Sequence, residues 1–347
     1  MLAVSCWQST DDFGSVKNES KVPNNLFIQP PRSFAINTNK SEVLIPFNYK
    51  SLLVYNYEEG KIVTEYKVDT LRYQQIYSKY ESMYPDRNFL DPFKSESARY
   101  SPFGLVKIGD IYFSEQTNSY QLGVAAYLPY SKNTDTAKVN VNDLRFALLS
   151  LNEDVFCTSH VVKDTFDYVA NFTLEFPFYR TDSILYVSEL SFTQNSSEIP
   201  LLAKYNISKS DSIIKYKSDI EIFYDAELHG KTKLTTFKRA FDVFEDQLYF
   251  TEGNYIYNLN SLEKVAPILQ DFKIASFMVT EDAVYTVLYI KSKKQCKLVK
   301  WNRTMQKKLK ESKLSFSNYI IYNFANQNLY SIEFNKDKEV IFKSYNM

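Results

Sequence analysis

The fold is decided by residues 241–265, which read FDVFEDQLYFTEGNYIYNLNSLEKV. Residues 241–244, 248–251 and 255–259 are short runs of the aromatic and β-branched residues that strands favour, and residues 260–265 turn into a fourth run. The polar residues between the runs supply tight-turn chemistry. The stretch therefore predicts a four-stranded antiparallel sheet. Because so small a sheet is not stable alone, it must pack against others.

The same arrangement recurs along the chain. Polar turns that lead into a strand with an aromatic residue occur at residues 42, 110, 154, 182, 246, 282 and 328. Their mean spacing is about 48 residues, within the range of β-propeller blades. Residues 34–63 contain a second such unit, with its third strand at residues 52–55. We therefore predict an all-β fold over residues 32–347, a β-propeller of six or seven four-stranded blades.

The composition agrees with a globular β protein. The 347 residues include 28 Tyr and 26 Phe but only 7 Gly, which favours strands and disfavours glycine-rich nucleotide-binding loops. Lys and Arg together number 41, as do Asp and Glu, so the charge balance gives no support for nucleic acid as a partner. The sequence has no uninterrupted apolar run of about 18 residues and therefore predicts no transmembrane helix.

Residues 1–31 are predicted to be a signal-peptide remnant and a flexible lipoprotein tether. Residues 1–6, MLAVSC, resemble the end of a bacterial lipoprotein signal peptide, in which Cys6 would be lipidated and become the mature N-terminus. The following residues are polar and contain three prolines, which is typical of a tether. The pair Asp11-Asp12 resembles a surface-export signal. The alternative is that Cys6 is an ordinary cysteine in a mobile terminus.

Residues 69–100 do not fit the repeat and are predicted to be an insertion, either functional or merely mobile. Tyrosine rings stack on sugar rings and on peptide side chains. The tyrosines of this insertion are therefore candidate ligand-binding residues: Tyr73, Tyr77, Tyr80 and Tyr84. The alternative is that most aromatic residues only fill the space between blades.

Three strands end alike, in Glu115, Glu189 and Glu252. If the blades are equivalent, these carboxylates lie near the same end of the propeller. Converging carboxylates can bind a hard cation such as calcium, or can form the acid and base of glycoside cleavage. The alternative is that each glutamate is solvated at the end of its strand.

A basic segment lies between residues 291 and 313, where ten Lys or Arg residues face a single acid, Glu311. One interpretation is a surface for an acidic polymer or for anionic lipid head groups. The other is an outer blade strand that its lysines protect against edge-to-edge pairing.

The sequence contains none of the common motifs for nucleophilic catalysis, phosphate binding or zinc-dependent proteolysis. The sequence has no nucleophile elbow, phosphate-binding loop or zinc-protease motif. Three cysteines give no disulfide framework, and a zinc site from His160 and His229 would need added carboxylates. Cys157 and His160, three residues apart, would point to opposite faces of a strand. The catalytic residues therefore stay unassigned. We predict no metal site and no cofactor, with calcium at the three glutamates as the one exception.

From residue 34 to the C-terminus, the strand pattern resembles the TolB-like six-bladed β-propeller lipoproteins of Bacteroidetes, many of which form families of unknown function. The resemblance implies an outer-membrane lipoprotein of the cell envelope, periplasmic or surface-exposed, that is more often a binding module than an enzyme.

The function expected is that of a lipid-anchored envelope protein that uses one propeller face to bind a glycan, a peptide or a partner protein. Its contact with the membrane would be through the lipid anchor only. The alternative is a carbohydrate-active enzyme, a glycoside hydrolase or lyase, with Glu115, Glu189 or Glu252 as acid or base.

Overall fold

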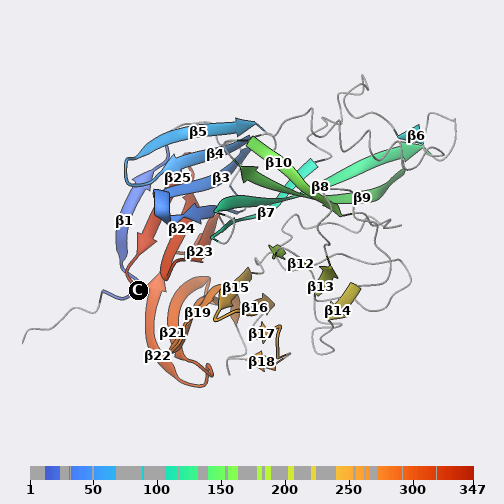
Figure 1. Cartoon of the computed structure of the whole chain (residues 1–347). Helices are drawn as coiled ribbons and strands as arrows, with labels where there is room; N and C mark the ends of the chain where they lie inside the picture. Colours follow the sequence, from blue (N-terminus) through green and yellow to red (C-terminus); the bar gives the residue numbers. More distant parts are fainter. Residues whose placement is uncertain are drawn as a thin grey trace, which may run out of the picture. The chain divides into compact units, whose positions relative to one another are not determined.

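The structure is a computed structural model of the 347-residue chain. It describes residues 12–23, 31, 33–48, 51–67, 88–89, 106–115, 118–131, 140–152, 155–162, 178–181, 184–188, 202–206, 220–223, 240–252, 255–261, 263–265, 272–290, 292–317 and 319–347. Apart from one short 3-10 turn, η1 (Thr38–Lys40), the regular elements of these residues are strands, so the predicted all-β class is confirmed (Figure 1).

The described strands form six sheets, five with four strands and one with five. The arrangement is propeller-like, and four blades are recognised in it. The predicted all-β, propeller-like arrangement of four-stranded sheets is thus confirmed. The predicted count of six or seven blades is not shown.

The chain divides into two compact units. The first comprises residues 1–21, 242–333 and 341–347, and the second comprises residues 22–241 and 334–340. The second unit contains three sheets. The first sheet consists of β2 (Ala35–Asn37), β3 (Glu42–Asn48), β4 (Ser51–Asn56) and β5 (Lys61–Lys67). The second consists of β6 (Asn88–Phe89), β7 (Val106–Ser114), β8 (Ser119–Ser131), β9 (Asn140–Asn152) and β10 (Val155–Val162), and the third of β11 (Phe178–Arg180), β12 (Ile184–Ser188), β13 (Leu202–Asn206) and β14 (Ile220–Phe223).

The first unit holds the other three sheets, apart from a few residues at its boundaries. One consists of β15 (Ala240–Phe244), β16 (Gln247–Glu252), β17 (Tyr255–Asn258) and β18 (Glu263–Val265). The next consists of β19 (Phe272–Val279), β20 (Ala283–Ile290), β21 (Gln295–Asn302) and β22 (Lys308–Leu314). The last consists of β23 (Ile320–Ala325), β24 (Asn328–Phe334), β25 (Val340–Tyr345) and β1 (Val16–Lys21). We call the last of these the closure sheet, because it joins the two ends of the chain.

Residues 241–265 form the four strands expected of them, β15 to β18, and the first three lie within one residue of the predicted bounds. The polar turn at Glu245 and Asp246 has positive φ at both residues, which tight hairpin turns require. The unit predicted at residues 34–63 is also confirmed, as β2 to β5. Of the predicted insertion at residues 69–100, only β6 lies within the described residues.

The N-terminal region contradicts the predicted tether. Residues 16–21 form β1, which pairs antiparallel with β25 from Val16 opposite Tyr345 to Lys21 opposite Ile341, the blue and red strands side by side in Figure 1. The prediction of a flexible segment over residues 1–31 is therefore wrong for this stretch. The polar composition has another physical cause, because an edge strand exposed along its length carries polar and charged residues.

The residues before β1 are also fixed, and we call residues 12–21 the N-terminal arm. Its Phe13 is 9% exposed and belongs to a buried cluster with Val287, Cys296, Leu298, Leu314, Tyr322, Leu329 and Tyr345. The amide of Gly14 donates to the carbonyl of Asn346, and the amide of Asn346 donates to the carbonyl of Ser15. The arm therefore fills part of the core and ties the two ends of the chain together.

Gly14 allows the arm to approach β22 closely. Its φ is +77°, and a Cβ placed on it would lie 2.5 Å from the Cβ of Ser312, closer than real contacts allow. We expect Gly14→Ala to lower the free energy of unfolding by about 2 kcal/mol, from backbone strain and steric overlap together. Chemical denaturation measures the change. Gly60→Ala is the control, because Gly60 has a similar φ of +68° but its nearest neighbour, the Tyr55 hydroxyl, lies 4.0 Å away. Equal losses would contradict the close approach at Gly14.

An asparagine marks the end of the third strand in each of the six sheets, when the strands are counted in chain order from β2, β7, β11, β15, β19 and β23. It ends the strand or follows it directly, at Asn56, Asn152, Asn206, Asn258, Asn302 and Asn346. Where the side chains are described, their amides hold the next turn. The Oδ1 atom of Asn258, for example, accepts from the amides of Asn260 and Ser261 at 2.9 and 3.2 Å. Asparagine suits this position because its side chain mimics a backbone turn. The asparagine thus marks a structural repeat.

Candidate functional site

The strongest concentration of polar chemistry in the described residues joins the β15–β18 sheet to the β19–β22 sheet. Asp242, on the first strand of one sheet, accepts a hydrogen bond from the amide of Val279, at the end of the first strand of the next, at 2.6 Å. The carboxylate thereby supplies a partner for a backbone amide at the end of β19. This bond fixes the two sheets to each other.

Arg303, in the turn between β21 and β22, reaches the same joint. Its guanidinium lies 5.1 Å from the ring centre of Phe244 and 5.4 Å from that of Tyr249, and it donates to the Tyr249 hydroxyl at 2.9 Å. That hydroxyl in turn donates to Gln247 at 3.0 Å. With two aromatic rings beside it and a hydrogen bond to the hydroxyl of one of them, Arg303 has little freedom to bind anything else.

Burial raises the pKa of Asp242 to about 7, against the opposing effects of the Val279 and Val243 amides and of Arg303. A carboxyl group that titrates near neutral pH is a general feature of catalytic sites. Here, however, the carboxylate is held by backbone amides of the joint. Among the described residues, no second carboxyl group contributes to its pKa, so no acid and base pair of the kind that cleaves glycosides is formed there.

The glutamates predicted as a site do not share one position in their sheets. Glu252 is the last residue of β16, which is the second strand of its sheet, whereas Glu115 directly follows β7, the first strand of the run β7–β10. Neighbouring strands of an antiparallel sheet run in opposite directions, so the ends of first and second strands lie at opposite edges. Glu115 is exposed. The assumed equivalence of the three strand ends therefore fails for Glu115.

The remaining predicted site residues lie outside the described residues: Glu189, Tyr73, Tyr77, Tyr80, Tyr84 and the proposed lipidation site Cys6. His229 lies outside them as well, and of Cys157 and His160 only the backbone, within β10, is described. Among the described side chains, no group of three or more His, Cys, Asp and Glu could hold a metal ion. No helix of the described part is long and apolar enough to cross a membrane.

The basic segment forms the outer half of the β19–β22 sheet. β22 is the edge strand, and its first four residues are exposed, so the basic segment does include an outer strand. That its lysines protect this strand against pairing stays a prediction. Glu311 binds both Lys297 and Lys308, the latter at 2.6 Å, and the ion pairs lower its pKa although burial opposes them. Lys300 pairs with Asp282 at 3.2 Å. Two acids thus neutralise part of the basic surface.

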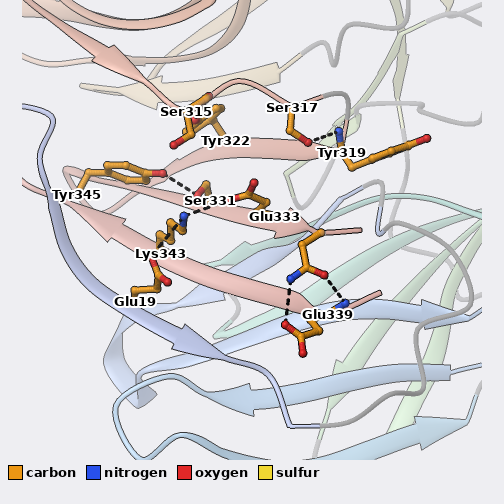
Figure 2. A network of polar contacts seen from close by, with 11 residues as sticks. Glu19, Ser315, Ser317, Tyr319, Tyr322, Ser331, Glu333, Glu339, Lys343 and Tyr345 are labelled. Atoms are coloured by element: carbon orange, nitrogen blue, oxygen red, sulfur yellow. Dashed lines mark hydrogen bonds and ion pairs between the residues drawn. The ribbon is translucent and has the colours of Figure 1, made fainter. Parts of the chain in front are cut away.

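The closure sheet carries a second charged group (Figure 2). The Lys343 ammonium lies 3.3 Å from Glu19 on β1 and 3.1 Å from Glu333 on β24. Burial would lower the pKa of Lys343, but the two carboxylates outweigh it and raise the pKa. The hydroxyl groups of Ser331 and Tyr345 are hydrogen-bonded at 3.0 Å in the same sheet. Lys343, on β25, therefore links its own strand to both β1 and β24.

One buried polar group of the second unit lacks a hydrogen bond. Tyr120 is 5% exposed and its hydroxyl has no partner within the described residues. Burial is the main cause of its raised pKa, with Glu42, Tyr66 and Tyr57 adding to it. A single water molecule would satisfy this hydroxyl.

Comparisons with known proteins leave the family open. No protein-family model matches the chain, and no curated protein matches it. Among solved structures it is similar to a protein described as a glucose dehydrogenase, over 95% of this chain and 100% of that one, with 10% sequence identity and a TM-score of 0.48. A likeness at this level carries no conclusion about function.

The joint at Asp242 and the Lys343 group were not anticipated from the sequence. Each has a signal in retrospect, since Asp242 and Lys343 are charged residues inside short runs of apolar ones. A charged side chain in such a run is partly buried and needs a partner. The sequence shows that a partner is needed but does not name it.

Proposed function

We propose that this chain is a lipid-anchored binding or interaction protein of the bacterial cell envelope. One face of its propeller binds a glycan, a peptide or a partner protein, and Cys6 carries the lipid. Under this proposal, the chain is related to the TolB-like propeller lipoproteins of Bacteroidetes. The protein then lies at the outer membrane, facing the periplasm or the cell exterior.

We also propose that the propeller has six blades. The support is the asparagine that closes the third strand in each of the six sheets, preceded by Tyr or Trp in five of them. A repeated turn at the same point of each sheet is what equivalent blades would have. Six blades would bring loops from every repeat around one central depression, which is a natural binding surface.

The observation that supports a binding function, rather than an enzymatic one, is that the described charged groups with shifted pKa values bind structural partners. Among the described residues, every charged side chain with a shifted pKa is engaged with a structural partner: Asp242, Asp282, Lys300, Glu311 and Lys343. Such groups hold strands and sheets together, so they are not free to exchange protons with a substrate.

A ligand screen tests the binding function. The melting temperature of the purified chain with Cys6→Ser is measured with calcium, with magnesium, with plant and host glycans, and with short peptides. A ligand of the folded state raises the melting temperature by mass action. A shift with one glycan or peptide class supports the proposal, and no shift with any of them argues for a protein partner. Cleavage of a bound glycan, abolished in Glu252→Gln, would instead favour the carbohydrate-active enzyme.

Lipidation has a separate test. The gene is expressed with its native upstream codons, and membrane fractionation of the Cys6→Ala variant is compared with that of the parent. Unchanged fractionation would overturn lipidation at Cys6.

A further inference from the structure

The basic segment concentrates charge to a degree that protection of an edge strand does not require. Residues 291–313 contain ten basic residues and one acid, a net charge of +9. Because the whole chain has 41 basic and 41 acidic residues, the rest of it carries a net charge of −9. Charged side chains on the edge strand itself protect it, but only three of the ten basic residues lie on β22: Lys308, Lys310 and Lys313. The excess therefore calls for another explanation.

The register of the sheet places like charges opposite each other. Lys297 lies opposite Lys313, and Lys300 lies opposite Lys310, on the neighbouring strands β21 and β22. Directly opposed like charges destabilise an antiparallel pair. Glu311 offsets this repulsion at Lys297, and Asp282 offsets it at Lys300. A partner with negative charge would offset it at Lys313, for which the described residues give no ion pair.

Several lysines of this surface are exposed and have no ion-pair partner within the described residues. They lie at both ends of the outer strands: Lys293 and Lys294 between β20 and β21, Lys307 between β21 and β22, and Lys313 on β22. β22 has seven residues, so the surface extends for about 23 Å along the strand. We call this set of exposed lysines the basic edge.

The N-terminal arm lies against β22, the strand that carries part of the basic edge. Gly14 packs against Ser312 of β22, and the Lys310 ammonium lies 5.6 Å from the ring centre of Phe13. Cys6 precedes the first residue of the arm, Asp12, by six positions, and six residues span at most about 20 Å. A lipid on Cys6 would therefore lie within about 20 Å of Asp12, the start of the arm.

From this juxtaposition, we propose that the basic edge contacts the head groups of an anionic membrane. The basic edge and the lipid on Cys6 then form a two-part anchor, in which the lipid inserts and the lysines bind the charged surface. The role of the lipid rests on the function proposed above, whereas binding by the lysines does not. The proposal gives the protein a membrane contact beyond the lipid anchor.

The test uses the full chain with Cys6→Ser, which has no lipid, so that a failure of lipidation cannot affect the result. Co-sedimentation is measured with phosphatidylcholine vesicles and with the same vesicles containing about one third phosphatidylglycerol. We expect binding only to the anionic vesicles, and its loss at about 0.5 M salt, where charges are screened beyond a few ångströms.

Two quadruple variants then locate the surface. Lys293→Gln, Lys294→Gln, Lys307→Gln and Lys313→Gln together are expected to weaken vesicle binding by about 600-fold, because each surface lysine contributes about a factor of five. The matched control makes the same change of charge at exposed lysines outside residues 291–313: Lys40→Gln, Lys61→Gln, Lys336→Gln and Lys338→Gln. It is expected to change binding by less than about threefold. Thermal unfolding of both variants verifies that they fold.

Three results would overturn the proposal. The first is that the Cys6→Ser chain does not bind anionic vesicles at low salt. The second is an equal loss in both quadruple variants, which would mean that net charge alone matters. The third is binding to polygalacturonate, a soluble acidic polysaccharide, without binding to vesicles, which would assign the basic edge to an acidic glycan.

Discussion

Removal of residues 1–21 is expected to prevent the first unit from folding. The truncation deletes β1, which completes the closure sheet, and Phe13, which fills the buried cluster around Leu298 and Leu329. Loss of a buried phenylalanine alone costs about 3 kcal/mol, and the exposed edge of β25 and the loss of Glu19 beside Lys343 add to this. The total is about the whole stability of an ordinary domain. Circular dichroism and urea denaturation of the purified truncation measure the effect.

A second truncation is the control. A chain that begins at Asp12 keeps every described contact of the N-terminal arm and is expected to unfold at the same urea concentration as the full chain. If both truncations are as stable as the full chain, residues 12–21 are the tether that their composition suggests, and the pairing of β1 with β25 is wrong. Phe13→Ala separates the contribution of the core from that of the strand.

This arm shows where reasoning from the sequence failed. Residues 241–265 were assigned correctly, because their strands are rich in the apolar and aromatic residues that strands favour. β1 is exposed at nearly every position, so its six residues, VKNESK, lack the pattern of a strand. Composition reflects exposure to solvent, which an edge strand and a tether share. Only pairing with β25, more than 300 residues away, distinguishes them.

The polar turns are an imprecise marker of the repeat. Their spacing along the sequence is irregular, because several kinds of polar residue suit a tight turn. The asparagines at the ends of the third strands are a better marker, because each has a specific task. Asn56 accepts from the amides of Glu58 and Glu59, as Asn258 does from the two equivalent amides of its own turn. The C-terminal Tyr345-Asn346 preserves the same pair, although its turn is divided between the two ends of the chain.

The candidate site was less predictable than the fold. Glu115, Glu189 and Glu252 follow similar tetrapeptides, but equivalence between blades depends on which strand of the sheet each one ends. Local sequence does not contain that information. The joint at Asp242 depends on Val279 and Arg303, 37 and 61 positions later in the chain, which meet it only when two sheets pack together.

The carboxyl group of Asp242 is expected to make the protein less stable as the pH rises through the neutral range. Its pKa in the folded protein is about 7, against an ordinary value of 3.8. Between these two values the folded state holds a proton that the unfolded state releases, so the free energy of unfolding falls as the pH increases. The full contribution is present below pH 4 and is lost above pH 7. A difference of about three pKa units corresponds to about 4 kcal/mol.

Asp242→Asn tests this directly, because asparagine is neutral at every pH and its carbonyl oxygen can still accept from the Val279 amide. Relative to the parent, the variant is expected to gain about 3 kcal/mol of stability between pH 5 and pH 8, measured by urea denaturation at both values. Asp282→Asn is the matched control. Asp282 is exposed and its pKa is lowered by Lys300, so it is ionised at both pH values and its replacement has the same effect at each. If Asp242→Asn also has the same effect at both values, Asp242 is ionised throughout. The backbone amides and the charge of Arg303 would then outweigh burial at this carboxyl group.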